Sequence, residues 1–160
     1  MENLVKFLLE NKLKITAAES CTGGLFAAGI TAVSGSSACF DGSFVTYSNE
    51  QKTRLLGVKP ETLENFGAVS FNTALEMSKG VRKSFGADIG IGITGIAGPT
   101  GGTKEKPVGL VYIAVSFEGG IVAHKCNFNG SRDEVRNAAV DFAKNLALNT
   151  AKKLLTQPEN

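Results

Sequence analysis

Apolar residues recur along the chain with two periods, and segments of one period alternate with segments of the other. Spacings of three and four residues, as at Leu4, Val5, Leu8 and Leu9, predict amphipathic helices. Runs rich in β-branched residues predict strands. Helices are expected at 2–11, 25–33, 48–57, 60–65, 70–84 and from 131 onward, and strands at 15–18, 43–47, 87–94, 108–117 and 121–128. The tail, 157–160, is expected to be frayed.

Three of these helices have a capping residue at the expected start. Ser48 with Gln51, and Ser131 with Glu134, have the capping-box pattern, in which a serine and a Gln or Glu three residues later bind free backbone N–H groups. Ser70 is the expected N-cap of the helix over 70–84.

The alternation of helices and strands defines a fold class. A Gly-Gly pair at 119–120 separates the last two strands and predicts an antiparallel hairpin. The sequence therefore predicts a three-layer α/β/α sandwich around a mixed, mostly parallel sheet with one late hairpin. We expect one domain over residues 1–160.

Composition narrows the function classes. A net charge of +2 argues against a protein that coats nucleic acid. Three widely spaced cysteines indicate no disulfide framework and fit a reducing compartment. We find no signal peptide and no apolar run of about 20 residues, so a cytoplasmic protein without a membrane partner is expected. The sequence leaves a homo-oligomer open.

The first candidate for chemistry is the segment 19–24, Glu-Ser-Cys-Thr-Gly-Gly, between an expected strand and an expected helix. Ser20 there is a candidate nucleophile beside backbone N–H groups that could form an oxyanion hole. The alternative is that Ser20 or Thr22 only caps the helix. Cys21 is a rival nucleophile, although a cysteine beside glycines is more often a packing residue.

A nucleophilic serine needs a base, and the chain has only one histidine, His124, in a β-prone stretch. Tyr47 and Lys52 flank another strand-to-helix junction and could converge on Ser20. A lysine acts as a base if burial lowers its pKa. The alternative is that Lys52 is a solvated lysine on an exposed helix face.

The glycine-rich segment 90–102 contains a literal G-x-G-x-x-G. A dinucleotide-binding site is rejected, because that motif must open a helix and the prolines that follow make a helix improbable. A loop whose backbone amides approach a ligand is one interpretation, and a mobile surface loop is the other.

Arg132 and Arg136 lie in the first turns of the last expected helix, where positive charge opposes the helix dipole. A bound phosphate would reverse that effect. The alternative is ion pairing with Asp133 or Glu134. No spacing of His, Cys or carboxylates predicts a metal site, and no cofactor is expected.

Six ordered segments are together similar to the CinA C-terminal domain family, and the resemblance spans almost the whole chain. Within residues 1–160 we expect no molybdopterin-binding-like domain of the kind that longer members carry at the N-terminus. The segments are 16–24, 42–50, 67–70, 94–99, 105–109 and 130–132.

The resemblance implies an α/β/α sandwich and an enzyme that hydrolyses the carboxamide of nicotinamide mononucleotide, a small-molecule substrate, in pyridine nucleotide salvage. Carried over by position, Ser20 is the nucleophile, Tyr47 and Lys52 activate it and shuttle its proton, and Thr94 lies beside the amide. The remaining expected substrate contacts are Thr22, Gly23, Gly95, Gly98, Arg132 on the phosphate side, and Arg136. The alternative is a non-enzymatic sensor or partner-binding module, because longer relatives are associated with competence or DNA damage.

Overall fold

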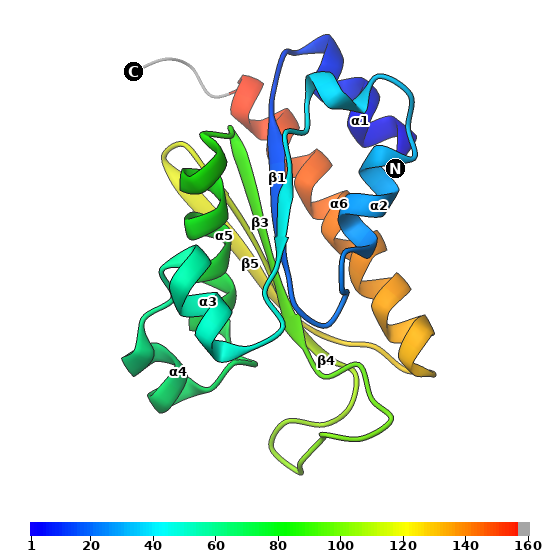
Figure 1. Cartoon of the computed structure of the whole chain (residues 1–160). Helices are drawn as coiled ribbons and strands as arrows, with labels where there is room; N and C mark the ends of the chain where they lie inside the picture. The colour runs from blue at the N-terminus through cyan, green and yellow to red at the C-terminus, as the bar shows by residue number, and fades with distance from the viewer. Residues whose placement is uncertain (157–160) are drawn as a thin grey trace.

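The computed structural model describes residues 1–156, and the expected frayed tail, 157–160, lies outside them. Helices and strands alternate along the chain (Figure 1). The helices are α1 (Glu2–Glu10), α2 (Leu25–Thr31), α3 (Asn49–Leu56), α4 (Pro60–Phe66), α5 (Phe71–Phe85) and α6 (Arg132–Thr156), with a 3-10 turn, η1 (Ser36–Ala38). The strands are β1 (Ile15–Glu19), β2 (Ser43–Val45), β3 (Ile89–Gly95), β4 (Leu110–Phe117) and β5 (Gly120–Asn127).

The five strands form one sheet in the order β2-β1-β3-β4-β5. β1 is parallel to both of its neighbours, whereas β4 is antiparallel to β3 and to β5. Four strands therefore run in one direction and β4 alone is reversed. The mixed, mostly parallel sheet is confirmed, and the late hairpin is β4–β5. The chain also reverses between β3 and β4, through the loop over 96–109.

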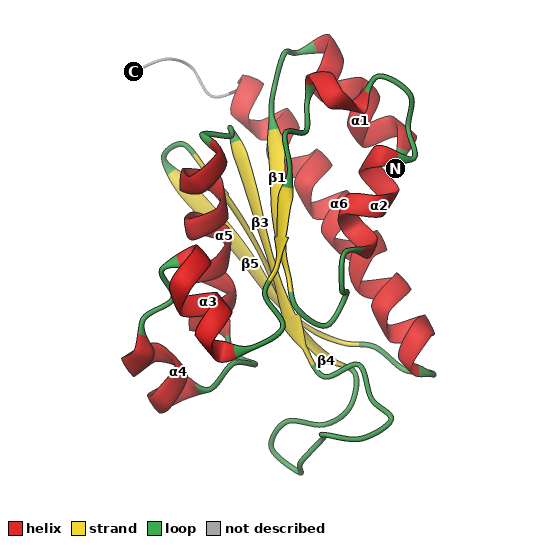
Figure 2. Ribbon diagram, viewed as in Figure 1, coloured by secondary structure: helices red, strands yellow, loops and turns green. Residues whose placement is uncertain are grey.

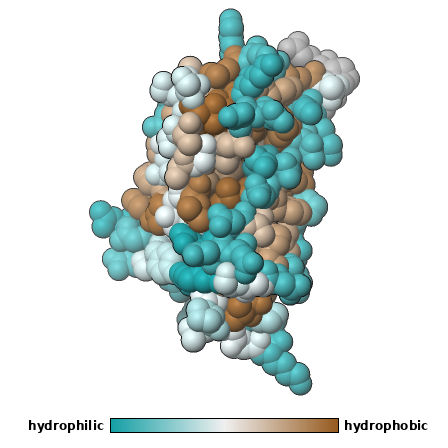
Figure 3. All heavy atoms as spheres, turned by 90° about the vertical axis from the view of Figure 1, so that its right-hand side faces the viewer, coloured by the Kyte–Doolittle hydropathy of each residue, from teal (hydrophilic) through white to brown (hydrophobic). Residues whose placement is uncertain are grey.

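Helices cover both faces of the sheet, which confirms the three layers (Figure 2). α3, α4 and α5 lie on one face, and α1, α2 and α6 lie on the other (Figure 1). Figure 3 views the second face, where hydrophobic residues lie among hydrophilic ones, as expected of amphipathic helices. Within residues 1–156, no helix combines the length and apolar character that crossing a membrane requires.

The larger hydrophobic core lies between the sheet and the layer of α1, α2 and α6. α6 contributes Ala139, Ala143 and Ala147, which recur every four residues and are fully buried. Small side chains on one stripe let this helix lie close to the sheet. A smaller core lies under α3 and α5 and includes Met77 and Val81.

Glycines in β3 hold α5 close to the other face of the sheet. A Cβ atom on Gly92 would lie 2.4 Å from the carbonyl oxygen of Ala74, and one on Gly90 would lie 2.4 Å from that of Ser78. Neither contact is sterically possible, so α5 rests directly on the strand backbone. The start of α5 is thereby fixed over the carboxyl end of β3.

All three expected N-caps are confirmed. Ser48 Oγ accepts a hydrogen bond from the backbone N–H of Gln51, and Ser70 Oγ accepts one from that of Thr73, each at 3.2 Å. Ser131 forms the reciprocal box, because its N–H donates to Glu134 Oε2 at 2.7 Å and its Oγ accepts from the Glu134 N–H at 3.4 Å.

Several expected boundaries were wrong by one or two residues. The strand expected over 43–47 ends at Val45, so Tyr47 lies in the loop that leads to α3. The helix expected over 25–33 ends at Thr31. In both places the apolar pattern of the sequence continues past the end of the regular element: Val33 packs on the core from the loop, whereas Tyr47 is exposed.

Candidate active site

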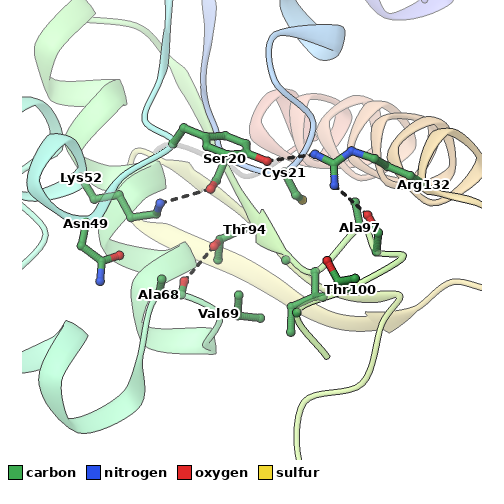
Figure 4. A pocket seen from close by; sticks show the side chains of 15 residues that line it. Ser20, Cys21, Asn49, Lys52, Ala68, Val69, Thr94, Ala97, Thr100 and Arg132 are labelled. Atoms are coloured by element: carbon green, nitrogen blue, oxygen red, sulfur yellow. Dashed lines mark hydrogen bonds between the residues drawn. The ribbon is translucent and has the colours of Figure 1, made fainter. Parts of the chain in front are cut away.

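A cleft of about 270 Å³ lies at the carboxyl ends of β1 and β3, beside the start of α3 (Figure 4). Ligand sites typically enclose about 300–1,000 Å³, so the cleft is near the small end of that range. Five stretches far apart in sequence line it: 20–21, 47–52, 68–69, 94–101 and residue 132 at the start of α6. The edge at which parallel strands end is where ligands bind in open α/β sheets.

Ser20 is held rigidly at the floor of this cleft. It follows β1 directly, and its backbone N–H donates to the carbonyl oxygen of Ile93 at 3.0 Å. That bond fixes the residue to the adjacent strand, β3. Its relative exposure is only 8%, and its side chain faces the cleft (Figure 4). A serine held in this way presents its hydroxyl to a ligand with little freedom to move.

Lys52 brings an amine to the Ser20 hydroxyl. The Ser48 cap sets the start of α3 so that Lys52 faces inward, and the lysine is only 1% exposed. Its Nζ donates to the backbone carbonyl of Thr46 at 2.8 Å and to Ser20 Oγ at 3.1 Å. The interpretation of Lys52 as a solvated surface lysine was wrong, and the predicted convergence of Lys52 on Ser20 is confirmed.

The surroundings of Lys52 favour its neutral form. Burial away from water lowers the pKa of Lys52, and the nearby Cys21 side chain opposes this only in part. Within residues 1–156, no carboxylate lies within 4.0 Å of the ammonium group. An amine of this kind is suited to accept a proton from a serine hydroxyl.

Cys21 lines the cleft beside Ser20, but its thiol is poorly suited to act as a nucleophile. Burial raises the pKa of the Cys21 thiol to about 11, and the charge of Glu19 adds to this. The thiol therefore stays protonated at neutral pH. Its backbone N–H makes no hydrogen bond to a backbone group of another residue among 1–156, and it lies against the Cys21 thiol itself.

Glu19 caps α2, a role that the sequence analysis gave to Ser20 or Thr22 as the alternative to a nucleophilic Ser20. Its carboxylate is fully buried and accepts hydrogen bonds from the backbone N–H groups of Gly24, Phe26 and Ala27 at 3.0–3.1 Å. The side-chain hydroxyls of Ser20 and Thr22 accept no hydrogen bond from the N–H groups at the start of this helix. Since Glu19 occupies the positive end of α2, the hydroxyl of Ser20 is free for the cleft.

Arg132 links two loops across the mouth of the cleft (Figure 4). Its Nη2 donates to the Tyr47 hydroxyl at 2.9 Å, and its Nη1 donates to the Gly98 carbonyl at 2.8 Å. Tyr47 is 63% exposed and contacts Arg132 through its hydroxyl, whereas Lys52 bonds to Ser20 and Thr46. Of the three expected catalytic residues, Lys52 is therefore paired with Ser20, whereas Tyr47 is paired with Arg132.

Thr94 joins two further segments at the back of the cleft. It is buried at the end of β3, and its Oγ1 donates to the Ala68 carbonyl at 2.7 Å (Figure 4). The neighbouring Gly95 and Gly98 also line the cleft, as the ligand-approach interpretation of the glycine-rich loop predicts. The hydrogen bond from Thr94 to Ala68 holds the segment before α5 against the end of β3.

Three expected substrate contacts, Thr22, Gly23 and Arg136, do not line the cleft. Arg136 Nη2 donates to the Thr22 carbonyl at 3.1 Å, and its Nη1 lies 3.5 Å from Asp133. A Cβ atom on Gly23 would lie 3.2 Å from the same Nη2. Arg136 therefore supports the turn at Thr22 and Gly23. Its contact with Asp133 agrees with the alternative interpretation, in which the arginine forms an ion pair.

Asn49, Ala68 and Val69 line the cleft, although the sequence analysis gave them no site role and placed them only within the family-like segments 42–50 and 67–70. Asn49 begins α3 one turn before Lys52, and this spacing could have indicated its place. The positions of Ala68 and Val69 depend on how α5 packs on β3, which has no local signal. Among residues 1–156, no group of three or more His, Cys, Asp or Glu side chains is placed to hold a metal ion.

Comparisons with known proteins agree on one family. Residues 1–151 match the family model of the CinA C-terminal domain. A putative competence-damage inducible protein of Acetivibrio thermocellus is 53% identical over 135 residues, which cover 84% of this chain and 33% of that protein. A CinA-like protein of Kosmotoga olearia is 53% identical over 142 residues, which cover 89% of this chain and 34% of that protein. The chain spans about a third of the length of these relatives.

Solved structures show the same architecture. A CinA superfamily protein from Klebsiella pneumoniae aligns with a TM-score of 0.90 at 38% identity, covering 94% of both chains. The competence/damage inducible protein CihA from Agrobacterium tumefaciens aligns with a TM-score of 0.87 at 44% identity, covering 92% of this chain and 94% of that one.

Proposed function

The chain belongs to the CinA C-terminal domain family, and from that premise we propose that it is a serine amidohydrolase. The proposed reaction converts nicotinamide mononucleotide and water into nicotinate mononucleotide and ammonia, a step of pyridine nucleotide salvage. The observation that carries the reaction class is the buried Lys52 Nζ at 3.1 Å from Ser20 Oγ in an open cleft. The choice of substrate rests on the resemblance to the family.

The first half of the reaction forms an ester on Ser20. In its neutral form Lys52 keeps its hydrogen bond to Thr46 and accepts the Ser20 hydroxyl proton, while Oγ attacks the carboxamide carbon. The carbonyl oxygen becomes negatively charged, and the backbone N–H of Cys21, the residue after the nucleophile, is the proposed donor that stabilises it. The C–N bond then breaks, and Lys52 gives its proton to the leaving nitrogen, which departs as ammonia.

The second half repeats these proton transfers with water. Lys52 accepts a proton from water as its oxygen attacks the ester carbon, and the C–O bond to Ser20 breaks. The proton returns to Ser20 Oγ, and the acid product loses its own proton to become a carboxylate. One amide and one water give one carboxylate and one ammonium ion, and the protein is unchanged.

Two further side chains have proposed roles at the mouth of the cleft. Arg132 is the cation in the cleft lining that a phosphate can reach, and phosphate far from the reacting carbon helps to position the substrate. Tyr47 is the proposed second member of the proton shuttle. Its hydroxyl oxygen accepts from Arg132, which leaves its own O–H free to donate.

The decisive test is ammonia release from nicotinamide mononucleotide by pure protein. Ser20→Ala is expected to fold normally and to lose activity at least about a hundredfold, as removal of a nucleophile does. Cys21→Ala is the matched control, because it removes the neighbouring side chain and leaves the backbone N–H in place, so its activity should stay near wild type. Near-wild-type turnover by Ser20→Ala would exclude this mechanism. No ammonia from the wild type would favour a non-enzymatic binding module.

A further inference from the structure

Lys52 is a buried amine that lines the cleft and has no charged hydrogen-bond partner. Its two hydrogen-bond partners, the Thr46 carbonyl and the Ser20 hydroxyl, are both uncharged. The buried carboxylate of Glu19, which directly precedes Ser20, is engaged by three N–H groups of α2. The cleft reaches Lys52, so a ligand group that replaces the amide can contact Nζ.

The proposed reaction places a new charge at this position. The carboxamide of the substrate is neutral, whereas the product carries a carboxylate on the same carbon. One carboxylate oxygen can accept from the Cys21 N–H and the other from Lys52 Nζ. A charge-assisted hydrogen bond of this kind is about twice as strong as a neutral one.

We propose that the cleft retains the carboxylate product of its own reaction as an ion pair with the Lys52 ammonium, so that product binding takes up a proton and product inhibition strengthens as pH falls. The inference rests on the proposed function and adds a mode of regulation at the same site. The recognised chemistry is an aromatic carboxylate at the position of the scissile carboxamide.

The other charged groups near the cleft do not replace Lys52 in this role. Besides Lys52, the titratable side chains that line the cleft are Cys21, Tyr47 and Arg132. The Cys21 thiol is neutral, because its pKa is raised to about 11. Arg132 lies at the mouth, bonded to Tyr47 and to the Gly98 carbonyl, and the substrate and the product carry the same phosphate toward it. On α3 itself, Glu50 and Arg54 are exposed.

The direction of the pH dependence follows from linkage. Burial lowers the pKa of Lys52 in the free protein, and a carboxylate in contact with Nζ raises it again. Between these two values the free protein lacks the proton and the complex holds it. Binding therefore tightens as pH falls through that window, and proton uptake disappears once the free protein is already protonated.

The test measures proton uptake by calorimetry in two buffers of different ionisation enthalpy at the same pH. Ser20→Ala, which cannot turn substrate over, is titrated with nicotinate mononucleotide and, as the matched ligand, with nicotinamide mononucleotide. At a pH between the Lys52 pKa values of the free protein and of the complex, we expect proton uptake for the carboxylate and none for the carboxamide. The double variants Ser20→Ala/Lys52→Met and Ser20→Ala/Lys52→Gln should abolish the uptake and weaken carboxylate binding at least about tenfold, which corresponds to 1.4 kcal/mol.

Three results would overturn the inference, and they differ in what they exclude. Equal proton uptake for the two nucleotides excludes the ion pair and leaves the proposed function intact. Uptake that persists in both Lys52 variants assigns the proton to another group. If neither nucleotide binds, the proposed substrate itself is wrong, and the inferred binding of its product is then excluded as well.

Discussion

At the scale of single residues, the proposed chemistry depends on the protonation state of Lys52. Burial lowers the pKa of this lysine, so the neutral amine forms below the pH at which a free lysine, with a pKa of about 10.4, loses its proton. We expect kcat/KM to rise with pH through this ionisation and then to level off.

The measurement is a pH–rate profile for the wild type, Lys52→Met and Lys52→Arg. Lys52→Met should lose the rising limb and most of the rate. Lys52→Arg should fail as well, because a guanidinium stays protonated and cannot act as the base. If Lys52→Met keeps the limb, another group is the base, and Tyr47 is the first to test.

Arg132 has two possible uses, and its substitution separates them. As a phosphate contact it contributes a charge-assisted hydrogen bond, worth about 1.5–3 kcal/mol. Arg132→Ala should then lower kcat/KM for nicotinamide mononucleotide by roughly ten- to a hundredfold and scarcely change that for the riboside, which lacks the phosphate. The measurement is the ratio of the two kcat/KM values.

The observed bonds of Arg132 to Tyr47 and Gly98 supply the opposing expectation. If Arg132 acts only by holding the two loops together, both substrates lose equally. Tyr47→Phe removes one of these bonds and leaves the cation in place. Loss of the proposed proton shuttle should lower both kcat/KM values, so the comparison uses their ratio, which should stay at the wild-type value.

At the scale of secondary-structure elements, the start of α2 depends on one side chain from the preceding strand. Glu19 accepts hydrogen bonds from three N–H groups at the N-terminus of this helix. The helix has seven residues and is too short to be stable alone. Glu19→Ala should lower the free energy of unfolding by about 2 kcal/mol or more, because the N–H groups are left buried without acceptors.

Urea denaturation of Glu19→Ala and Glu19→Gln checks this role. Glu19→Gln keeps an oxygen acceptor and removes the charge, so its loss should be smaller. Activity of the folded Glu19→Ala should also fall, since Ser20 and Cys21 lie between Glu19 and the helix it caps. Unchanged stability in Glu19→Ala would contradict the role of Glu19 as the cap.

At the scale of the whole molecule, the buried lysine opposes stability. Below the ordinary lysine pKa the unfolded chain holds a proton on Lys52, whereas the folded chain, with its lowered pKa, binds it less readily. The unfolded state therefore binds more protons, and the contribution of Lys52 to folding stability decreases as pH falls through the window between the two pKa values.

Lys52→Met should consequently gain stability relative to the wild type as pH is lowered from about 10 toward 7. Thermal unfolding of both proteins at several pH values measures this as a difference in Tm that moves in favour of the variant. A difference that is constant with pH, or that moves the other way, would show that Lys52 stays charged in the folded protein.

Most of the fold could be predicted from the sequence, because its signals are local. The period of apolar residues located the helices and strands, and Ser48, Ser70 and Ser131 marked helix starts with their own side chains. The convergence of Lys52 on Ser20 also followed from local order, since both residues lie at strand-to-helix junctions of parallel neighbours.

The rest could not be predicted because it depends on tertiary contacts. Glu19 caps a helix that begins six residues later, and the shape of the intervening turn is not determined by the sequence of the turn alone. Arg136 faces the Thr22 carbonyl instead of the cleft, and this depends on where α6 crosses the sheet. Helical spacing placed Arg132 and Arg136 one turn apart on α6, but it could not tell which of the two reaches the cleft.

The close approach of α5 to the glycines of β3 has a consequence for how this family is compared across species. Gly90 and Gly92 set the height of α5 above the sheet, and that height places Ala68 where Thr94 can bind its carbonyl. A side chain at either glycine would displace the cleft wall although it touches no ligand. Invariance of these two positions among relatives would therefore reflect a steric requirement. A ranking of residues by invariance alone would rank them as highly as Ser20, although they have no contact with a ligand.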